Sequence, residues 1–278
     1  MTPALVRGYS NRFALNDLWG QAFGDDPEFI SAMYGCGYLR SEDIFALTVD
    51  GRPVAALFLP KYSIRVKGTD LPIRLLSCVT TDAAQRGKGY MSLLIKRVLE
   101  LVRDDCDGVC VIPVSDDLIP FYERFGFRAA FSVSERVYEP EEAMGNALKL
   151  DFSGYGAEGY YDAYYEKYAA EGCVFKTKER FLQAVTEYTH PTQPCEFVSF
   201  EGGFAFLQRG VSEITVREWV GEDEKALADT LCIHYHLPVR IQDRVGDVKK
   251  PIAMLCPFTE ELTAYAETTD LYLNCMYN

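Results

Sequence analysis

The spacing of apolar residues in the first half of the chain predicts helices and strands in a mixed order. Two helices are expected over residues 11–36, and an Asp-Gly turn between two apolar runs predicts a hairpin over residues 44–59. The run 75–80 predicts a strand, and apolar residues then recur at helical spacing over residues 90–102. A buried strand over residues 109–114 follows. This order predicts the α/β class, with one mixed sheet.

The second half shows a similar succession of elements. The segment 160–188 is predicted to be helical, and a Gly-Gly turn predicts a hairpin over residues 197–207. A strand over 214–219, a helix over 224–235 and a buried strand over 252–256 follow. The second half therefore repeats the pattern of the first.

A local match supports this repeat. The segment Pro113–Leu118 has the same pattern of residue types as Pro257–Leu262, and each follows an apolar run. We therefore predict two tandem domains, residues 1–140 and residues 141–278, the second ending in a C-terminal strand.

A glycine loop joins the strand over 75–80 to the helix that follows it. Gly87 and Gly89 allow a tight turn in which backbone N–H groups converge at a helix N-terminus, a geometry that binds phosphate. Arg86 and Lys88 add cationic donors. A P-loop would need a glycine in the place of Asp82, so that class of site is set aside.

The loop, Arg86-x-x-Gly89 followed by an amphipathic helix, resembles the coenzyme A loop of the GCN5-related N-acetyltransferases. A dinucleotide-binding fingerprint would need a third glycine where the helix has Ser92. The segment Phe121–Phe127 reads Phe-Tyr-x-x-x-Gly-Phe, a second match to that superfamily in the expected order. The resemblance covers roughly residues 10–138.

The resemblance implies an acetyl-CoA-dependent N-acetyltransferase, in which a primary amine of a small molecule or peptide attacks the thioester directly. It also implies that Tyr122 protonates the leaving thiolate; read from the residues alone, this aromatic side chain would be core. The residues that it implies for coenzyme A binding are Val79, Thr80 and Thr81 for pantetheine, and Arg86, Gly87, Lys88, Gly89, Tyr90 and Met91 for the pyrophosphate. A non-catalytic acyl-CoA-binding or interaction protein is the alternative.

The second half lacks the features of the first where the chemistry would occur. Three carboxylates, Glu222 to Glu224, stand in the place of the glycine loop and would repel a pyrophosphate. An active domain followed by a degenerate copy resembles the enhanced-intracellular-survival family of acetyltransferases, without its sterol-carrier-like third domain. That resemblance implies the carboxylate of Asn278 as the base, and Asp116 or Asp117 is the alternative.

Charge and composition restrict the partners. Residues 1–140 hold 16 Lys and Arg against 18 Asp and Glu, whereas residues 141–278 hold 12 against 23. This acidity argues against nucleic-acid binding and would suit a cationic substrate. No apolar run is long enough to cross a membrane. Nine cysteines without a Cys-x-x-Cys pair favour the cytoplasm, and a homo-oligomer is left open.

Two further groups of residues have structural and functional readings. His234 and His236 have no cysteine or carboxylate cluster beside them in the sequence, so no metal site is expected. Five tyrosines between Tyr160 and Tyr168 could line an amine pocket, although packing between the domains is the favoured reading.

Overall fold

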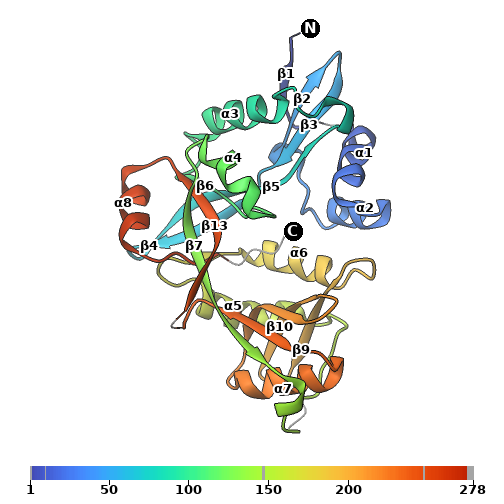
Figure 1. The fold of residues 1–278 in the computed structure, drawn as a ribbon, viewed down its shortest axis with the longest axis vertical. Helices are drawn as coiled ribbons and strands as arrows, with labels where there is room; N and C mark the ends of the chain where they lie inside the picture. Colours follow the sequence, from blue (N-terminus) through green and yellow to red (C-terminus); the bar gives the residue numbers. More distant parts are fainter. Residues whose placement is uncertain (1, 10, 146–147, 247, 274–278) are drawn as a thin grey trace.

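The computed structural model describes residues 2–9, 11–145, 148–246 and 248–273. Thirteen strands within these residues join in one mixed sheet, with the order β1-β2-β3-β5-β6-β13-β7-β12-β11-β10-β9 and with β4 pairing to β5 and β8 (Figure 1). The strands are β1 Ala4–Arg7, β2 Ile44–Val49, β3 Arg52–Phe58, β4 Lys61–Val66, β5 Thr69–Thr81, β6 Gly108–Val111, β7 Arg128–Tyr138, β8 Val174–Phe175, β9 Cys195–Phe200, β10 Gly203–Arg209, β11 Ile214–Val220, β12 Val239–Asp243 and β13 Lys249–Pro257.

Helices cover the faces of this sheet. They are α1 Arg12–Phe23, α2 Pro27–Gly35, α3 Tyr90–Val102, α4 Ile119–Glu123, α5 Tyr161–Tyr168, α6 Lys178–Tyr188, α7 Glu224–Tyr235 and α8 Glu260–Thr268. None of the helices in the described part of the chain is long and apolar enough to cross a membrane. The mixed α/β sheet predicted from the sequence is confirmed.

The hairpin β2–β3 has helices on both sides because its side chains alternate between two cores. Phe45 and Leu47 pack in the same cluster as the inner residues of α3. Ile44 and Ala46, which point the other way, pack with α1 and α2. Figure 1 shows α3 on one side of the hairpin and the pair α1 and α2 on the other. The two predicted N-terminal helices and the hairpin are therefore confirmed.

The same strand–helix–strand unit occurs twice. Strands β5 and β6 are parallel and are joined through α3, and strands β11 and β12 are parallel and are joined through α7. The counterpart of β6 in the second half is therefore β12, and the prediction that residues 252–256 fill this role is wrong. The predicted helical segment 160–188 is also interrupted, because β8 separates α5 from α6.

Strand β13 lies in the sheet of the first half. It runs antiparallel to β6 on one side and to β7 on the other. Strand β7 in turn pairs with β13 through its first part and with β12 through its last part, so it runs through both halves (Figure 1). A division into domains at residue 140 stays a prediction. Under that division, the second domain supplies one central strand of the first.

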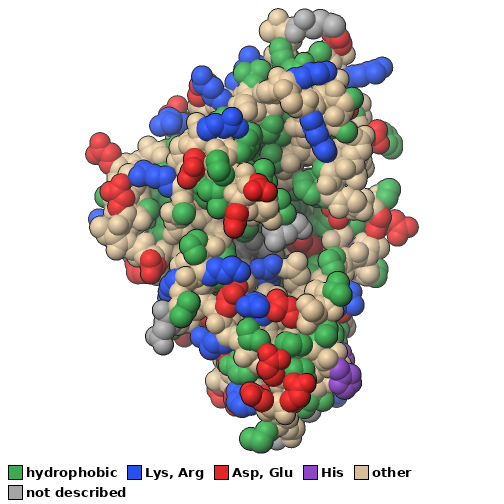
Figure 2. Space-filling model, viewed as in Figure 1, with side chains coloured by type: hydrophobic (Ala, Val, Ile, Leu, Met, Phe, Trp, Pro, Cys, Tyr) green, Lys and Arg blue, Asp and Glu red, His purple; other side chains and the backbone are tan. Residues whose placement is uncertain are grey.

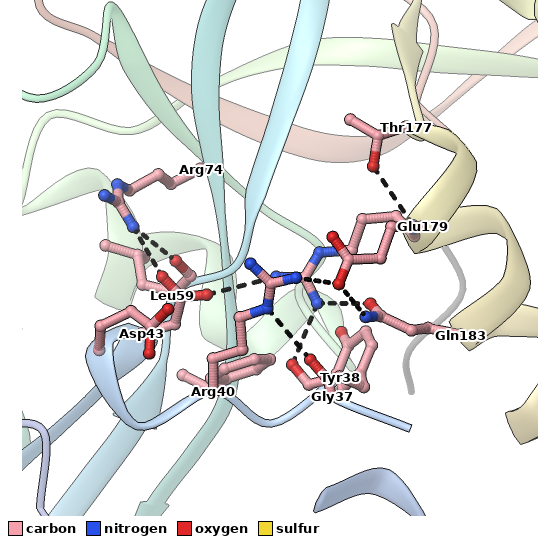
Figure 3. A network of polar contacts seen from close by, with 12 residues as sticks. Gly37, Tyr38, Arg40, Asp43, Leu59, Arg74, Thr177, Glu179 and Gln183 are labelled. Atoms are coloured by element: carbon pink, nitrogen blue, oxygen red, sulfur yellow. Dashed lines mark hydrogen bonds and ion pairs between the residues drawn. The ribbon is translucent and has the colours of Figure 1, made fainter. Parts of the chain in front are cut away.

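A buried network of charges fastens α6 to the first half (Figure 3). The carboxylate of Asp43 lies 3.2 Å from a guanidinium nitrogen of Arg74 and 3.3 Å from one of Arg180, and the three side chains are 2%, 3% and 6% exposed. Arg180 also donates to the backbone oxygen of Tyr38 at 3.0 Å and to Gln183 Oε1 at 2.9 Å. This network fixes α6 against the first sheet.

Candidate active site

Strands β5 and β6 separate before β5 ends. Their parallel pairing runs from Ile73 opposite Gly108 to Leu76 opposite Val111, whereas β5 continues to Thr81. A β-bulge in β5 falls at the separation, where Cys78 has a positive φ of 50°. Beyond Leu76, the backbone N–H and C=O groups on this edge of β5 are therefore not bonded to β6. Such an edge can form strand-like hydrogen bonds with an extended ligand.

A cleft of about 380 Å³ occupies this separation. Trp19 and Phe23 of α1 form one wall, and Cys78 and Val79 of the bulge form another. Tyr122 of α4 closes the far side. Helix α1, the bulge and α4 thus line an open cleft between the two strands, with the size of a small acyl-bearing ligand.

The glycine loop ends at the N-terminus of α3. Gly87 and Gly89 have positive φ values of 78° and 79°, a conformation that favours glycine. Gly89 is the N-cap of α3 and supplies no side-chain acceptor, so the first backbone N–H groups of the helix are not capped by it. Open space lies beside both glycines. This geometry fits the predicted phosphate site.

The basic side chains of the loop are exposed beside this helix end. Arg86 Nε donates to the backbone oxygen of Thr81 at 3.2 Å, and Lys88 Nζ donates to Gln85 Oε1 at 2.8 Å. The side chains of Tyr90 and Met91 pack against the core of the first half. Their bulk therefore lies away from the open side of the loop.

Tyr122 is buried in the wall of the cleft, against the ring of Phe127 with a centroid distance of 5.8 Å. Burial raises the pKa of its hydroxyl to about 12. At neutral pH the hydroxyl therefore stays protonated, as an acid must before it gives up a proton. The structure places this side chain beside Val79, as the two sequence motifs require.

The other predicted site residues that the structure describes do not line the cleft, but Asp116 lines a hollow that shares Ile112 and Val114 with it. Asp116 and Asp117 are exposed in a 3₁₀ turn, and neither caps α4, whose N-cap is Leu118. Thr80 is buried, and its hydroxyl donates to the backbone oxygen of Leu18 at 3.2 Å. Asn278 lies outside the described residues.

Two carboxylates near the cleft were missed by the sequence analysis. Asp25 lines the cleft and accepts hydrogen bonds from Trp19 Nε1 and, at 3.1 Å, from Gln193 Nε2. Glu187 is buried at the end of α6. Burial raises the pKa of the Cys78 thiol, and the charges of Asp25 and Glu187 add to this shift, because both approach the bulge. Neither carboxylate belongs to a motif, so no sequence signal marked them.

The corresponding separation in the second half is filled by the protein itself. The pairing of β11 with β12 ends at Val216, and three residues further Trp219 stands where Val79 stands beyond Leu76. The backbone N–H of Trp219 donates to the Tyr168 hydroxyl at 2.9 Å, and that hydroxyl donates to the Trp219 oxygen at 3.1 Å. The tyrosine thus satisfies the backbone edge that stays exposed in the first half.

Replacing Tyr168 with Phe should destabilise the protein without opening a second coenzyme A site. The substitution removes both hydrogen bonds to the buried Trp219 backbone, which should cost about 1–3 kcal/mol of unfolding free energy. Chemical denaturation measures this loss, and titration with acetyl-CoA counts the sites. If the variant bound two molecules of acetyl-CoA per chain, the Tyr168 hydroxyl alone would be what closes the second half to this ligand, which would contradict our expectation.

The acidic residues of the second loop have structural roles. Asp223 is the N-cap of α7 and accepts from the Ala226 N–H at 2.9 Å. Glu224 accepts from Nε and Nη2 of Arg136 and from the Tyr138 hydroxyl at 2.7 Å. The Ala226 N–H and the Arg136 guanidinium are thus already bonded to carboxylates, and these donors are not available to a phosphate.

The tyrosine-rich segment packs in the core of the second half, except for Tyr165, which is 39% exposed. Tyr164 and Tyr168 are fully buried and stack at 5.0 Å between centroids. Both pack inside the second half, and neither lines the cleft. His234 stacks on Phe152 at 5.3 Å. Among the described residues no group of His, Cys, Asp and Glu could hold a metal ion.

Comparisons with known proteins agree with this geometry. Residues 12–130 match the family model described as an acetyltransferase (GNAT) domain. No curated protein matches the chain. With this match, the fold and the cleft define an acyltransferase. Residues 12–130, which hold both sequence motifs, are therefore similar to a GNAT acetyltransferase domain.

Several solved structures share the fold. A probable N-acyltransferase from Enterococcus faecalis V583 is 17% identical, with a TM-score of 0.70 over 92% of this chain and 72% of the other. Eis1 from Mycobacterium abscessus is 14% identical, with a TM-score of 0.66 over 95% and 76%. Saccharomyces cerevisiae N-myristoyltransferase with bound myristoyl-CoA is 9% identical, with a TM-score of 0.55 over 91% and 82%. The predicted likeness to the Eis type is therefore supported at the level of the fold.

Proposed function

We propose that the protein transfers the acetyl group of acetyl-CoA to a primary amine of a small molecule or peptide. The observation that carries the proposal is the arrangement along β5: Val79 and Tyr122 line the cleft where β5 leaves β6, and the glycine loop at the N-terminus of α3 follows the end of β5 in the chain. A pyrophosphate at the loop would place pantetheine along Val79 to Thr81 and the thioester near Tyr122.

The proposed reaction is a direct displacement. The amine nitrogen attacks the thioester carbonyl carbon, a C–N bond forms and the C–S bond breaks, and the electron pair of that bond leaves with sulfur. The attacking nitrogen loses one proton to a base, and the thiolate gains one from the Tyr122 hydroxyl. Holding amine and thioester together in the cleft supplies much of the acceleration.

The carboxylate of Asn278 remains our proposed base. Leu273, the last described residue before it, is buried in a core cluster against which Ile112 packs, and Ile112 also lines the cleft. Five extended residues reach at most about 17 Å, which sets the greatest distance that this carboxylate could lie from Leu273. Extending the chain beyond Asn278 moves this carboxylate, and unchanged activity in the extended protein would speak against it.

Selective stabilisation by acetyl-CoA is the first test of the proposed function. A ligand that binds only the folded state raises its stability by mass action, so acetyl-CoA should raise the melting temperature where ATP and NAD do not. Thiol release in the presence of amines then tests turnover. Stabilisation without turnover would favour an acyl-CoA-binding protein, and equal effects of the three ligands would refute the coenzyme A site. Free thiols at the eight described cysteines fit the proposed cytoplasmic location.

Replacing Arg86 with Ala should weaken acetyl-CoA binding about tenfold or more. The exposed guanidinium is anchored to the Thr81 oxygen beside the helix end, where it would meet a phosphate with charge-assisted hydrogen bonds. Calorimetric titration measures the affinity. Arg103→Ala is the matched control, because this arginine lies past the other end of α3, over the Phe258 ring. An equal loss in the two variants would mean that only the net charge matters.

A further inference from the structure

The cleft between β5 and β6 is lined from both faces of the sheet. Tyr122 and Val79 pack in the core that contains α3. Trp19 and Cys78 pack in the core of α1 and α2 on the other face, and all four residues line the cleft. The proposed phosphate site lies at the N-terminus of α3, so coenzyme A would enter from the α3 face. The acceptor would therefore approach the thioester from the face of α1.

The wall of the cleft on the α1 face is aromatic. Trp19 and Phe23 meet edge to face, with 6.0 Å between their ring centroids. Trp19 is buried, whereas Phe23 is 46% exposed, so part of its ring meets solvent beside the cleft. Figure 2 shows hydrophobic side chains around the hollowed centre of the molecule. Such a wall packs well against apolar carbon atoms, and its ring faces attract a cation.

Asp25 supplies the charge at this wall. It lies in the turn between α1 and α2, which begins at Gly24 with a positive φ of 75°. Of the described residues that line the cleft, Asp25 is the only charged one. Its carboxylate accepts hydrogen bonds from Trp19 Nε1 and, at 3.1 Å, from Gln193 Nε2. Both donors are neutral, so they orient the carboxylate without cancelling its charge.

We infer that the acceptor is a primary amine on an apolar stem, with its ammonium group at Asp25 and its stem against Trp19 and Phe23. The inference rests on the proposed function and names the substrate class of that site. An alkylamine has a pKa near 10 and arrives protonated at neutral pH. The carboxylate would bind this form before the nitrogen gives its proton to the base. A polyamine or an aminoglycoside would bring further charges, which meet no second carboxylate among the described residues of the cleft.

The first test compares acceptors and needs no variant. Hexylamine and 2-phenylethylamine carry an apolar stem, Nα-acetyl-lysine amide presents the same chemistry from a peptide side chain, and spermidine and kanamycin carry several charges. Thiol release from acetyl-CoA should show kcat/KM at least about tenfold higher for an amine on an apolar stem than for either polycation. A preference between the free amines and the lysine side chain identifies the source of the stem.

Asp25→Asn tests the role of the carboxylate. The substitution should raise KM for 2-phenylethylamine about tenfold, because it removes a charge-assisted hydrogen bond to the ammonium group. It should leave kcat within about threefold, since binding that is equal in the ground state and the transition state changes only KM. Inhibition by 2-phenylethanol, which has the same shape without the charge, should not change. A merely structural role of Asp25 would weaken both ligands alike.

Two further variants complete the comparison. Asp17→Asn is the matched control, because this exposed carboxylate lies on α1 and does not line the cleft, so KM should stay the same. Gln193→Met removes one of the two bonds that hold Asp25 and should raise KM about threefold. Such a rise would show that the second half helps to shape the amine site. Each variant is first titrated with acetyl-CoA, whose affinity should not change.

The outcomes separate the inference from the proposed function. Turnover of spermidine or kanamycin at least equal to that of the amines on apolar stems overturns the inference and leaves the acetyltransferase in place. A fall in kcat for Asp25→Asn with KM unchanged also overturns it. If no amine is turned over, calorimetry with 2-phenylethylamine in the presence of coenzyme A decides, and absence of binding overturns the inference. Loss of selectivity for acetyl-CoA itself would instead refute the proposed function.

Discussion

Replacing Tyr122 with Phe should lower kcat about 100-fold or more while leaving the affinity for acetyl-CoA within about twofold of the original. The hydroxyl lies in the wall of the cleft, and its pKa of about 12 keeps it protonated at neutral and mildly alkaline pH. The thiolate would then leave without its proton donor. Steady-state kinetics of thiol release measure the change, and calorimetric titration measures binding.

Tyr138→Phe is the control for this experiment. Burial and the bond to Glu224 likewise raise the pKa of Tyr138 to about 12, but its hydroxyl bonds Glu224 of the second half and does not line the cleft. Its loss should not change kcat.

The pH profile is a second test of Tyr122. Because its pKa is raised, ionisation of this tyrosine should not lower the rate until well above pH 10. Equal kcat values for the original protein and Tyr122→Phe would end the assignment of Tyr122 as the acid.

Asp43→Ala should reduce the unfolding free energy by about 3–5 kcal/mol, because it leaves Arg74 and Arg180 buried without the carboxylate between them. For a chain of this size the melting temperature should fall by roughly 6–20 °C. Differential scanning calorimetry measures this fall.

Asp105→Ala is the control for Asp43→Ala, because it removes an exposed carboxylate near Arg74 instead of a buried one. Asp105 also approaches Arg74, at 3.9 Å, but its side chain is 43% exposed. An exposed pair is worth about 1 kcal/mol at most, so the melting temperature should change little. If the two variants lost similar amounts in melting temperature, the buried position of Asp43 between Arg74 and Arg180 would not be a major source of stability.

The local chemistry of the site could be predicted from the sequence. A glycine with a positive φ, a helix start and a cationic neighbour act within a few residues, so the loop at Gly87 and Gly89 could be recognised without the fold. The Phe-Tyr segment was likewise placed correctly beside the cleft. The role of Tyr122, the coenzyme A contacts and the domain division stay predictions.

The long-range features could not be predicted. An apolar run over residues 252–256 predicts a buried strand but not its neighbours. These depend on which other strands have an unpaired edge, and here β13 pairs with β6 and with β7. Glu187 lies on α6, which the bond between Arg180 and Asp43 fastens to the first half across a long separation in sequence.

The place of β13 also sets the order in which the protein can be completed during synthesis. Strand β7 ends at Tyr138 and β13 ends at Pro257, so 119 further residues must be made before the first sheet closes. At roughly 5–20 residues per second, the ribosome takes on the order of ten seconds for this stretch. During that time the facing edges of β6 and β7 have no partner strand and are open to wrong pairing. The sheet of the first half is therefore completed only late in synthesis. The glycine loop reaches its final surroundings only after the second half has been made.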